Sequence, residues 1–269
     1  MKQRVITALV GLAILFTILA FYMTPVLPIA AALLTVFAVY EALHALGCLE
    51  AKLFSYSVMA AAAAIVVAPP TYFFTHFSLS TTVGALALLF LWLRYHGRYT
   101  AEKLGFAAGI SVLIAMSLRC FVLMRDLLGY AEGFYALLVT FTAAWMSDTG
   151  GYFAGRWFGK HKLCPHISPK KTVEGAIGGI VFAAAGLVIL NLIVEHFIGR
   201  PIVLAPMLIA SPLLTAISIM GDLSASVIKR DAGLKDYGNL FPGHGGVLDR
   251  FDSVLPLAPV VYLLFYYFL

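Results

Sequence analysis

The sequence predicts an all-α polytopic membrane protein with about nine transmembrane helices, and three observations lead to this fold class. Of its 269 residues, 62% are hydrophobic and 12% are charged, with a mean hydropathy of +0.95. Soluble globular domains carry about 25% charged residues, so this composition excludes an ordinary soluble domain. Apolar runs that can cross a hydrocarbon core of about 30 Å recur along the chain, and Lys and Arg collect at alternate ends of these runs.

Nine apolar runs define the predicted helices in chain order. The run at 81–94 is shorter than the others. The first run has no small-residue cleavage site before Met23, which favours an uncleaved membrane anchor over a signal peptide. The segment MAAAAAIVVAPP, residues 59–70, indicates a closely packed helix that ends before Pro69. The predicted spans are residues 5–23, 26–46, 53–75, 81–94, 105–124, 133–156, 173–198, 202–228 and 248–269.

The distribution of Lys and Arg predicts the orientation. Cytoplasmic loops hold an excess of these residues, and a cytoplasmic N-terminus places 15 of the 18 on the cytoplasmic side. Nine spans then place the C-terminus outside. The net charge of +5 is attributed to this bias, and it suits attraction to anionic lipid headgroups. Nucleic acid is therefore not an expected partner. The 15 residues are Lys2, Arg4, Lys52, Arg94, Arg98, Lys103, Arg156, Lys160, Lys162, Lys170, Lys171, Lys229, Arg230, Lys235 and Arg250, and the other three are Arg119, Arg125 and Arg200.

The two halves of the chain differ in their polar residues. Residues 1–130 carry no motif that points to chemistry, and the three widely spaced cysteines indicate neither a disulfide framework nor a metal cluster. Glu41 and His44, one helical turn apart, are interpreted as an interfacial pair without a chemical role. Residues 131–269 are predicted to form the catalytic part, because ionisable groups near membrane spans usually mark function. Eight of the 13 acidic residues lie between residues 148 and 252, namely Asp148, Glu174, Glu195, Asp222, Asp231, Asp236, Asp249 and Asp252.

The first polar segment of the second half is SDTGGYFAGRWFGKH, which begins at Ser147. On a helix, Asp148, Tyr152, Gly155 and Gly159 share one face, which combines a carboxylate with small residues. Such a face can contribute a carboxylate to a functional site. The alternative is a glycine-zipper contact between helices, in which Asp148 is a satisfied interfacial residue.

The second segment, HISPKKTVEGAIGG, precedes and opens an apolar helix. Thr172 can cap that helix, and Glu174 suits its positive end. Lys170 and Lys171 stand just before it, so ammonium groups and backbone N–H groups converge as in an anion site. The alternative is that the two lysines only determine topology beside the lipid headgroups, which leaves Glu174 unexplained.

The third segment, GDLSASVIKRDAGLKDYGNLFPGHGGVLDRFD, joins two predicted helices. On the first helix, Asp222, Ser226 and Lys229 share a face, so a carboxylate and an ammonium group point into the same space. Asp249 and Asp252 are three residues apart and are expected on one face of the next helix. Carboxylates held this way form a hard oxygen site that suits Mg²⁺, which binds through one or two carboxylates plus substrate phosphates.

A glycine-rich corner connects these two helices. Gly243, Gly245 and Gly246 permit close backbone approaches, and Pro242 and His244 stand among them. A glycine corner that opens a helix is suited to cradling phosphate, and together with the aspartates and the preceding basic residues it describes a metal–phosphate site. The alternative is a re-entrant turn with salt bridges, which would join Asp231, Asp236, Lys235 and Arg250.

These residues resemble the signature of the phosphatidate cytidylyltransferases, also called CDP-diacylglycerol synthases. The signature covers 27 consecutive residues, 226–252. SPKKTVEG (168–175) and SDTGGYFAGRWFGK also resemble that family, so the similarity extends over about 145–252, with Gly151 where alanine is expected. The matching signature residues are Ser226, Lys229, Arg230, Lys235, Asp236, Gly238, Leu240, His244, Gly245, Gly246, Asp249, Arg250 and Asp252.

The resemblance implies a reaction of CTP with phosphatidic acid that gives CDP-diacylglycerol and pyrophosphate. It implies Mg²⁺ as cofactor, with a second, monovalent cation as a further candidate. Asp222 and Asp249 are the expected metal ligands, with Asp252 and Asp148 as further ligands or supporting partners. Catalytic roles are expected for the three acidic residues Asp222, Asp249 and Asp252 and for Lys229, His244 and Asp236. The expected substrate-binding residues are Lys170, Lys171, Glu174, Ser226, Arg230, Lys235, Gly245, Gly246 and Arg250.

Two other classes of function are alternatives. CDP-alcohol phosphotransferases and prenyltransferases also carry aspartate pairs on helices near the cytoplasmic face, but their patterns lack the Lys-Arg, Lys-Asp and His-Gly-Gly run. A transporter that uses buried carboxylates is the non-enzyme alternative. The unequal halves and the lack of an internal repeat weigh against a transporter.

The resemblance also implies an architecture. We expect the last four spans to form a polar cavity that faces the cytoplasm and opens sideways, because a two-chain lipid must enter from the bilayer. The protein is expected in the bacterial cytoplasmic (inner) membrane. The N-terminal spans can pack, dimerise or seal the cavity, and a homodimer is the expected assembly.

Overall fold

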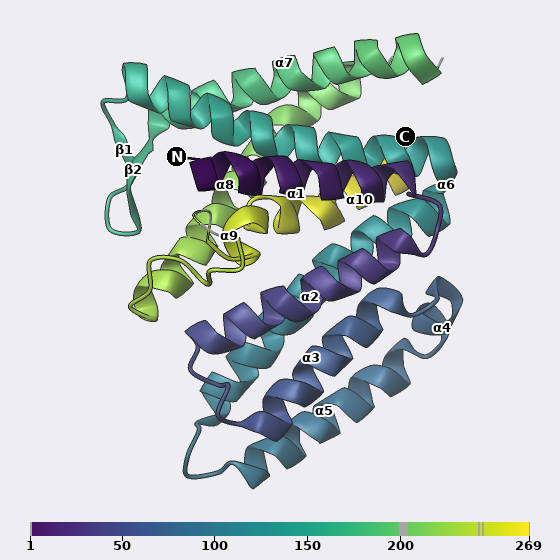
Figure 1. The fold of residues 1–269 in the computed structure, drawn as a ribbon, viewed down its shortest axis with the longest axis vertical. Helices are drawn as coiled ribbons and strands as arrows, with labels where there is room; N and C mark the ends of the chain where they lie inside the picture. The colour runs from purple at the N-terminus through teal and green to yellow at the C-terminus, as the bar shows by residue number, and fades with distance from the viewer. Residues whose placement is uncertain (1, 199–203, 242, 244, 269) are drawn as a thin grey trace. The chain divides into compact units, whose positions relative to one another are not determined.

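The structure, a computed structural model, describes residues 2–198, 204–241, 243 and 245–268. Helices account for almost all of the regular structure in these residues (Figure 1). The helices are α1 (Lys2–Ala20), α2 (Val26–Ala45), α3 (Lys52–Val67), α4 (Pro70–Thr75), α5 (Phe77–Arg94), α6 (Ala101–Phe158), α7 (Val173–Ile198), α8 (Leu204–Asp231), α9 (Leu248–Phe251) and α10 (Val254–Phe268).

The helices have the length and composition of membrane spans. Within the described residues, five of them, α2, α5, α6, α7 and α8, are long and apolar enough to cross a bilayer. Shorter apolar helices are α3, α10 and the stretch Leu9–Ala20 of α1. Many large apolar side chains are exposed on these helices, as expected where lipid takes the place of water. These features are those of an integral membrane protein and confirm the predicted helical class.

A glycine interrupts the longest helix. The predicted spans 105–124 and 133–156 both fall within α6, which has 58 residues. Gly129 has a φ of 80° and a ψ of −168°, outside the helical region, so two helices meet there. A positive φ favours glycine because it has no Cβ. The break therefore lies in the predicted gap between the two spans.

Helix α3 ends before the proline pair, as predicted. Its last residue is Val67, and Ala68 has extended backbone angles. The short helix α4 follows, so the predicted span 53–75 comprises two helices. The last carbonyls of α3 lack helical N–H partners, and the buried Arg119 donates from Nη1 to the carbonyls of Ile65 and Ala68. Arg119 thus has a structural role in the helix end.

The chain divides into two compact units, and the division differs from the predicted one at about residue 130. The first unit contains Met1–Asp126 together with Asp231–Arg250, and the second contains Leu127–Arg230 together with Phe251–Leu269. Residues 231–250, which include much of the glycine-rich corner, therefore belong to the same unit as the N-terminal helices.

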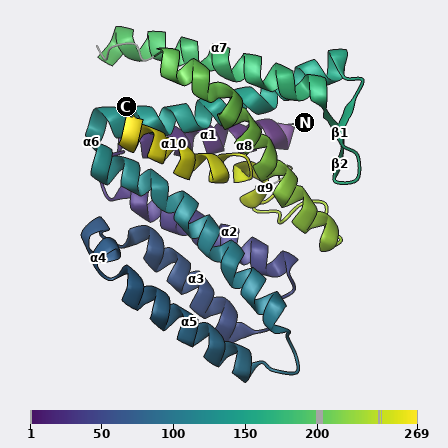
Figure 2. The same ribbon diagram turned by 180° about the vertical axis from the view of Figure 1, so that it is seen from behind.

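In the first unit, α2 and α3 lie side by side and α5 lies next to α3 (Figures 1 and 2). Val39 and Leu43 of α2 and Phe54 of α3 are fully buried in its core. The Tyr95 hydroxyl, just after α5, accepts a hydrogen bond from the Leu53 amide at 3.1 Å. This bond ties the end of α5 to the start of α3.

In the second unit, glycines bring α6 and α7 into close contact, and the two helices run side by side in both ribbon views (Figures 1 and 2). A Cβ on Gly150 would collide with Phe182, and a Cβ on Gly178 would overlap the Cβ of Ala154. Gly155 and Gly159 pack against Thr172 in the same way. The close helix packing that the glycine-zipper alternative requires is therefore present, whereas the role of Asp148 stays a prediction.

A small antiparallel sheet connects α6 to α7. Its strands are β1 (Lys162–Cys164) and β2 (Ser168–Thr172), with Lys162 opposite Thr172 and Cys164 opposite Ser168. The sequence analysis did not predict strands here, because a three-residue and a five-residue strand carry too little periodicity to be recognised. The consequence for function is that Lys170 and Lys171 are held on a strand.

Candidate functional site

A lysine and an aspartate from different elements of the second unit form an ion pair. The Nζ of Lys171, on β2, lies 2.6 Å from Oδ2 of Asp222, on α8. The same Nζ is 3.4 Å from the Ile219 carbonyl. Both side chains are partly exposed, at 22% for Lys171 and 29% for Asp222. Two motifs that lie about 50 residues apart in the sequence therefore meet at one point.

Asp252 lies in the same electrostatic environment. It occupies the turn between α9 and α10, and its Oδ1 accepts a hydrogen bond from the Ser253 amide at 2.8 Å. The Asp222 carboxylate and the Lys229 ammonium both lie within electrostatic range of the Asp252 carboxyl. Lys229 itself is buried. Asp222 and Lys229 both lie on α8, seven residues apart, as a shared helical face requires.

Asp148 completes this group from α6. The Ser253 side chain, Asp222 and Lys171 all lie within electrostatic range of its carboxyl group. The glycine contacts between α6 and α7 fix the position of the helix that carries Asp148. We call Asp148, Lys171, Asp222, Lys229 and Asp252 the charged cluster.

The charged cluster fits a divalent cation that is shared with phosphate. Among the residues that the structure describes, no three His, Cys, Asp or Glu side chains are arranged to hold a metal on their own. Mg²⁺ does not need such a cage, because it binds through one or two carboxylates plus substrate phosphates. Asp222 and Asp252 could supply such carboxylates, and Lys171 and Lys229 could supply positive charge for phosphates.

The glycine-rich corner in the first unit is organised by a different set of contacts. The Phe241 amide donates to the Gly245 carbonyl at 2.9 Å and closes the turn. Oδ2 of Asp249 accepts hydrogen bonds from the amides of Tyr237, at 2.8 Å, and Gly246, at 2.9 Å. Helix α9 is only four residues long and ends at Phe251. The prediction that Asp249 and Asp252 share one face of a continuous helix is therefore wrong.

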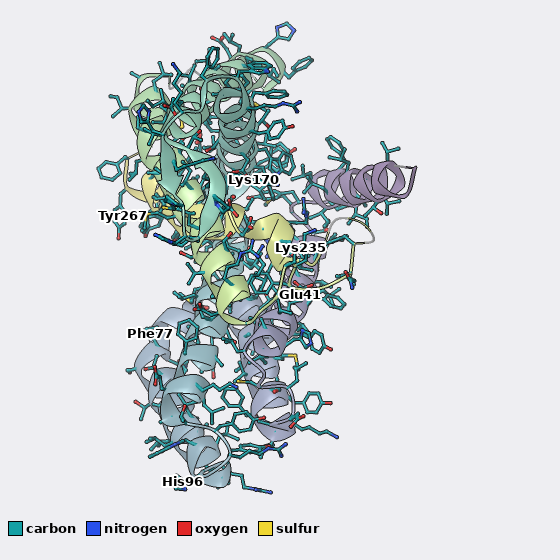
Figure 3. The ribbon with its side chains drawn as sticks, turned by 90° about the vertical axis from the view of Figure 1, so that its left-hand side faces the viewer. Glu41, Phe77, His96, Lys170, Lys235 and Tyr267 are labelled. Carbon is teal, nitrogen blue, oxygen red and sulfur yellow. The ribbon has the colours of Figure 1, made fainter. Side chains whose placement is uncertain are left out.

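Glu41 is the residue that the sequence analysis misjudged. Its carboxylate accepts hydrogen bonds from the amides of Val247 and Leu248, both at 2.9 Å, and the residue is 5% exposed. Figure 3 labels Glu41 on α2, beside the loop that leads to α9. His44 is exposed, so the interfacial pair does not describe Glu41. The available signal was an acidic residue inside an otherwise apolar helix.

The glycines of this corner make room for carboxylates. A Cβ on Gly246 would overlap the Glu41 carboxylate, and a Cβ on Gly238 would lie 2.8 Å from its Oε1. Gly245 has a φ of +88°, and a Cβ there would lie 2.8 Å from Oδ2 of Asp249. In this structure, the close approaches predicted for phosphate at Gly245 and Gly246 are made by these two carboxylates. The phosphate cradle stays a prediction.

The segment before α7 behaves partly as predicted. The Thr172 hydroxyl accepts a hydrogen bond from the Gly175 amide at 3.1 Å, which confirms the predicted cap. Glu174 accepts hydrogen bonds from the amides of Lys160 and His161, and its Oε1 lies 2.6 Å from Nδ1 of His161. Glu174 therefore links the end of α6 to the beginning of α7.

The other predicted site residues do not belong to the charged cluster. Lys170 and Lys235 are exposed, and Figure 3 labels both. Ser226 is half-buried on α8 between Asp222 and Lys229. His244 lies outside the described residues. The remaining predicted site residues are exposed, namely Arg230, Asp236 and Arg250.

The chain is similar to several proteins named phosphatidate cytidylyltransferase. Phosphatidate cytidylyltransferase from Bacillus subtilis is 40% identical over 168 residues, which are 62% of this chain and 60% of that protein. The proteins of the same name from Haemophilus influenzae and Staphylococcus saprophyticus are 43% identical over 141 and 134 residues. These matches cover 51% and 50% of this chain, and 47% and 50% of the relatives. The chain thus matches about half the length of these relatives.

A sequence model of a whole family gives broader coverage. The model described as the Cytidylyltransferase family matches residues 2–268, which is nearly the full chain. This match includes the N-terminal helices, for which the sequence analysis found no motif. The matched range covers both compact units except for the first and last residues of the chain. The chain therefore belongs to the Cytidylyltransferase family.

Proposed function

We propose that this protein is a phosphatidate cytidylyltransferase, which transfers CMP from CTP to phosphatidic acid and releases pyrophosphate. The family match and the names of the relatives support this activity. The observation that carries the proposal is the contact between Lys171 and Asp222, at 2.6 Å within the charged cluster. This contact places an ammonium group, which can bind phosphate, next to a carboxylate, which can bind a metal ion.

The proposed reaction is an in-line displacement at phosphorus. A phosphate oxygen of phosphatidic acid forms a bond to the α-phosphorus of CTP, while the bond from that phosphorus to the oxygen bridging to the β-phosphate breaks. The electron pair leaves with pyrophosphate. Catalysis of such a transfer consists largely of positioning and charge neutralisation. Lys171 and Lys229 would offset the repulsion between the two anionic phosphates.

Mg²⁺ is the proposed cofactor. When bound, it would neutralise phosphate charge and orient the phosphate oxygens. Asp222 and Asp252 would hold it, with Asp148 as a further ligand or supporting partner. Asp249 is proposed as an acidic residue that the reaction requires, and a monovalent second ion is also proposed. The other proposed substrate contacts are Lys170, Glu174, Ser226, Arg230, Lys235, Gly245, Gly246 and Arg250, with His244 and Asp236 near the attacking phosphate.

The proposal includes a membrane arrangement. We propose nine spans in a bacterial cytoplasmic membrane, with the N-terminus and a laterally open polar cavity on the cytoplasmic side. The excess of Lys and Arg on one side of the predicted spans supports this orientation. The N-terminal helices are proposed to contribute to a homodimer. Labelling of single cysteines introduced into the predicted loops would test the topology, and cross-linking in membranes would test the dimer.

The decisive experiment measures product formation directly. Purified protein in detergent is incubated with labelled CTP and phosphatidic acid, with Mg²⁺ or with a chelator. We expect a labelled CDP-lipid and pyrophosphate only in the presence of Mg²⁺. The absence of a CDP-lipid under several lipid and detergent conditions, from protein that is folded, would refute the proposed function.

A further inference from the structure

We propose that Glu41 is a positioning residue, whose buried carboxylate holds the backbone of the glycine-rich corner and thereby orients Asp249. The inference rests on the proposed function, because it assigns Asp249 to a reacting site. Its consequence is that the N-terminal half of the chain contributes to catalysis.

Three consecutive backbone amides of the corner donate to the carboxylates of Asp249 and Glu41. The amide of Gly246 donates to Asp249, and the amides of Val247 and Leu248 donate to Glu41. Each donor to Glu41 is 2.9 Å from a different carboxylate oxygen. Both oxygens are therefore committed to the two residues that immediately precede Asp249.

Without these hydrogen bonds, burial of the Glu41 carboxylate in an apolar helix would be unfavourable. Glu41 is 5% exposed and belongs to an apolar helix of 20 residues. Ionisable side chains are costly at membrane depth and are retained where they serve a function. Gly238 and Gly246 both leave room for this carboxylate, and a side chain at either position would collide with it. The corner is thus built around Glu41.

The effect on Asp249 follows from its own contacts. Oδ2 of Asp249 accepts from the amides of Tyr237 and Gly246, at the two sides of the corner. Loss of the Glu41 contacts releases Val247 and Leu248, so the Gly246 amide and the Asp249 side chain lose their fixed geometry. A displacement of about 1 Å in a reacting group can reduce a rate by about 10²-fold.

The first test compares Glu41→Gln and Glu41→Ala with Glu102→Gln. Glu102 is an exposed residue in the first turn of α6 and serves as the matched control. We expect both Glu41 variants to lower kcat by about 10- to 100-fold, with a smaller change in the KM for CTP, and the control to match the original protein. The Gln variant keeps the size of the side chain and one acceptor, so it covers the case in which the Ala variant fails to fold.

The second test is a double-mutant cycle with Gly246→Ala. The φ of Gly246 is not positive, so alanine is compatible with the backbone, and the three atoms nearest to an added Cβ all belong to the Glu41 carboxylate. We expect Gly246→Ala to lower kcat in the original protein and to add little to the loss caused by Glu41→Ala. Fully additive losses would overturn the assigned contact.

Hydrogen–deuterium exchange separates this inference from the proposed function. The Val247 and Leu248 amides should exchange faster in both Glu41 variants than in the original protein and in the control. Unchanged exchange would overturn the anchoring contact, and faster exchange with an unchanged kcat would overturn the positioning role. If the original protein forms no CDP-lipid, the proposed function and the positioning role both fail, whereas exchange still decides the contact.

Discussion

The charged cluster and the glycine-rich corner hold their carboxylates in different ways. In the charged cluster, Asp222 pairs with the side chain of Lys171, and both remain partly exposed. In the glycine-rich corner, Glu41 and Asp249 accept hydrogen bonds from backbone amides. A phosphate or a metal can replace a side-chain partner by a small movement of that side chain. Replacing a backbone partner requires the loop to rearrange, so the corner holds preorganised carboxylates, whereas the pair of Lys171 and Asp222 is exchangeable.

Asp249→Asn tests the corner and has the largest expected effect. Asparagine keeps one oxygen that can accept the Tyr237 and Gly246 amides, so we expect a folded and inserted protein. Because the negative charge is lost, Mg²⁺-dependent turnover should fall by at least about 10³-fold. Turnover is measured over a Mg²⁺ titration, with thermal unfolding of the same sample. Near-original activity would remove Asp249 from the residues that the proposed reaction requires.

Asp222→Asn tests the exchangeable pair. The substitution removes the charge that pairs with Lys171 and one proposed Mg²⁺ ligand, so we expect turnover to fall by about 10²- to 10³-fold. Asp231→Asn is the matched control, since Asp231 is an exposed aspartate at the end of the same helix. Its activity should be unchanged. Equal losses in the two variants would mean that Asp222 has no special role.

A lysine pair allows a comparison within one strand. Lys171 contacts Asp222, whereas its neighbour Lys170 is exposed. We expect Lys171→Ala to lower kcat/KM by about 10- to 100-fold and Lys170→Ala to act mainly on the KM for CTP, by less than about tenfold. Initial rates over a range of CTP concentrations distinguish the two. A larger loss for Lys170→Ala would indicate that the observed ion pair is not the productive one.

Gly178→Ala tests the packing that positions Asp148. An added Cβ would overlap Ala154, and overpacking typically destabilises by about 1–3 kcal/mol. Gly105→Ala is the control, because a Cβ there meets nothing within 4 Å and alanine favours a helix by about 1 kcal/mol. Thermal unfolding in detergent should show a lower Tm only for Gly178→Ala. An unchanged Tm would show that α6 and α7 can separate slightly without cost.

The features that were predicted correctly depend on local chemistry. Thr172 caps α7 because a threonine hydroxyl reaches the amide three residues ahead. Helix α3 ends at Val67 because Pro69 excludes the helical conformation before it. Asp222 and Lys229 lie seven residues apart on α8, and helical periodicity places such residues on one face. Each of these inferences needs only a few adjacent residues.

The features that were missed depend on contacts between distant segments. Glu41 and Val247 are 206 residues apart in the sequence, and no local pattern connects them. The break after Phe251 separates Asp249 from Asp252, although their spacing fits a helix. The Ser253 amide instead donates to the Asp252 carboxylate within that turn. A single sequence carries no local signal for such pairings, because the partners are brought together only by the fold.

Removal of the ion pair between Arg98 and Glu50 has the smallest expected effect. This exposed pair is a reference for the less exposed pair of Lys171 and Asp222. Arg98 and Glu50 are 60% and 75% exposed, in contrast to Lys171 and Asp222. Exposed pairs contribute about 0–1 kcal/mol because water and salt screen them and because both side chains lose freedom. Arg98→Ala should therefore change the free energy of unfolding by less than about 1 kcal/mol and leave CTP turnover unchanged. A loss of turnover in a variant that is still folded would mean that this end of α5 also contributes to the reaction. Exposure of an ion pair would then not distinguish structural charges from reacting ones.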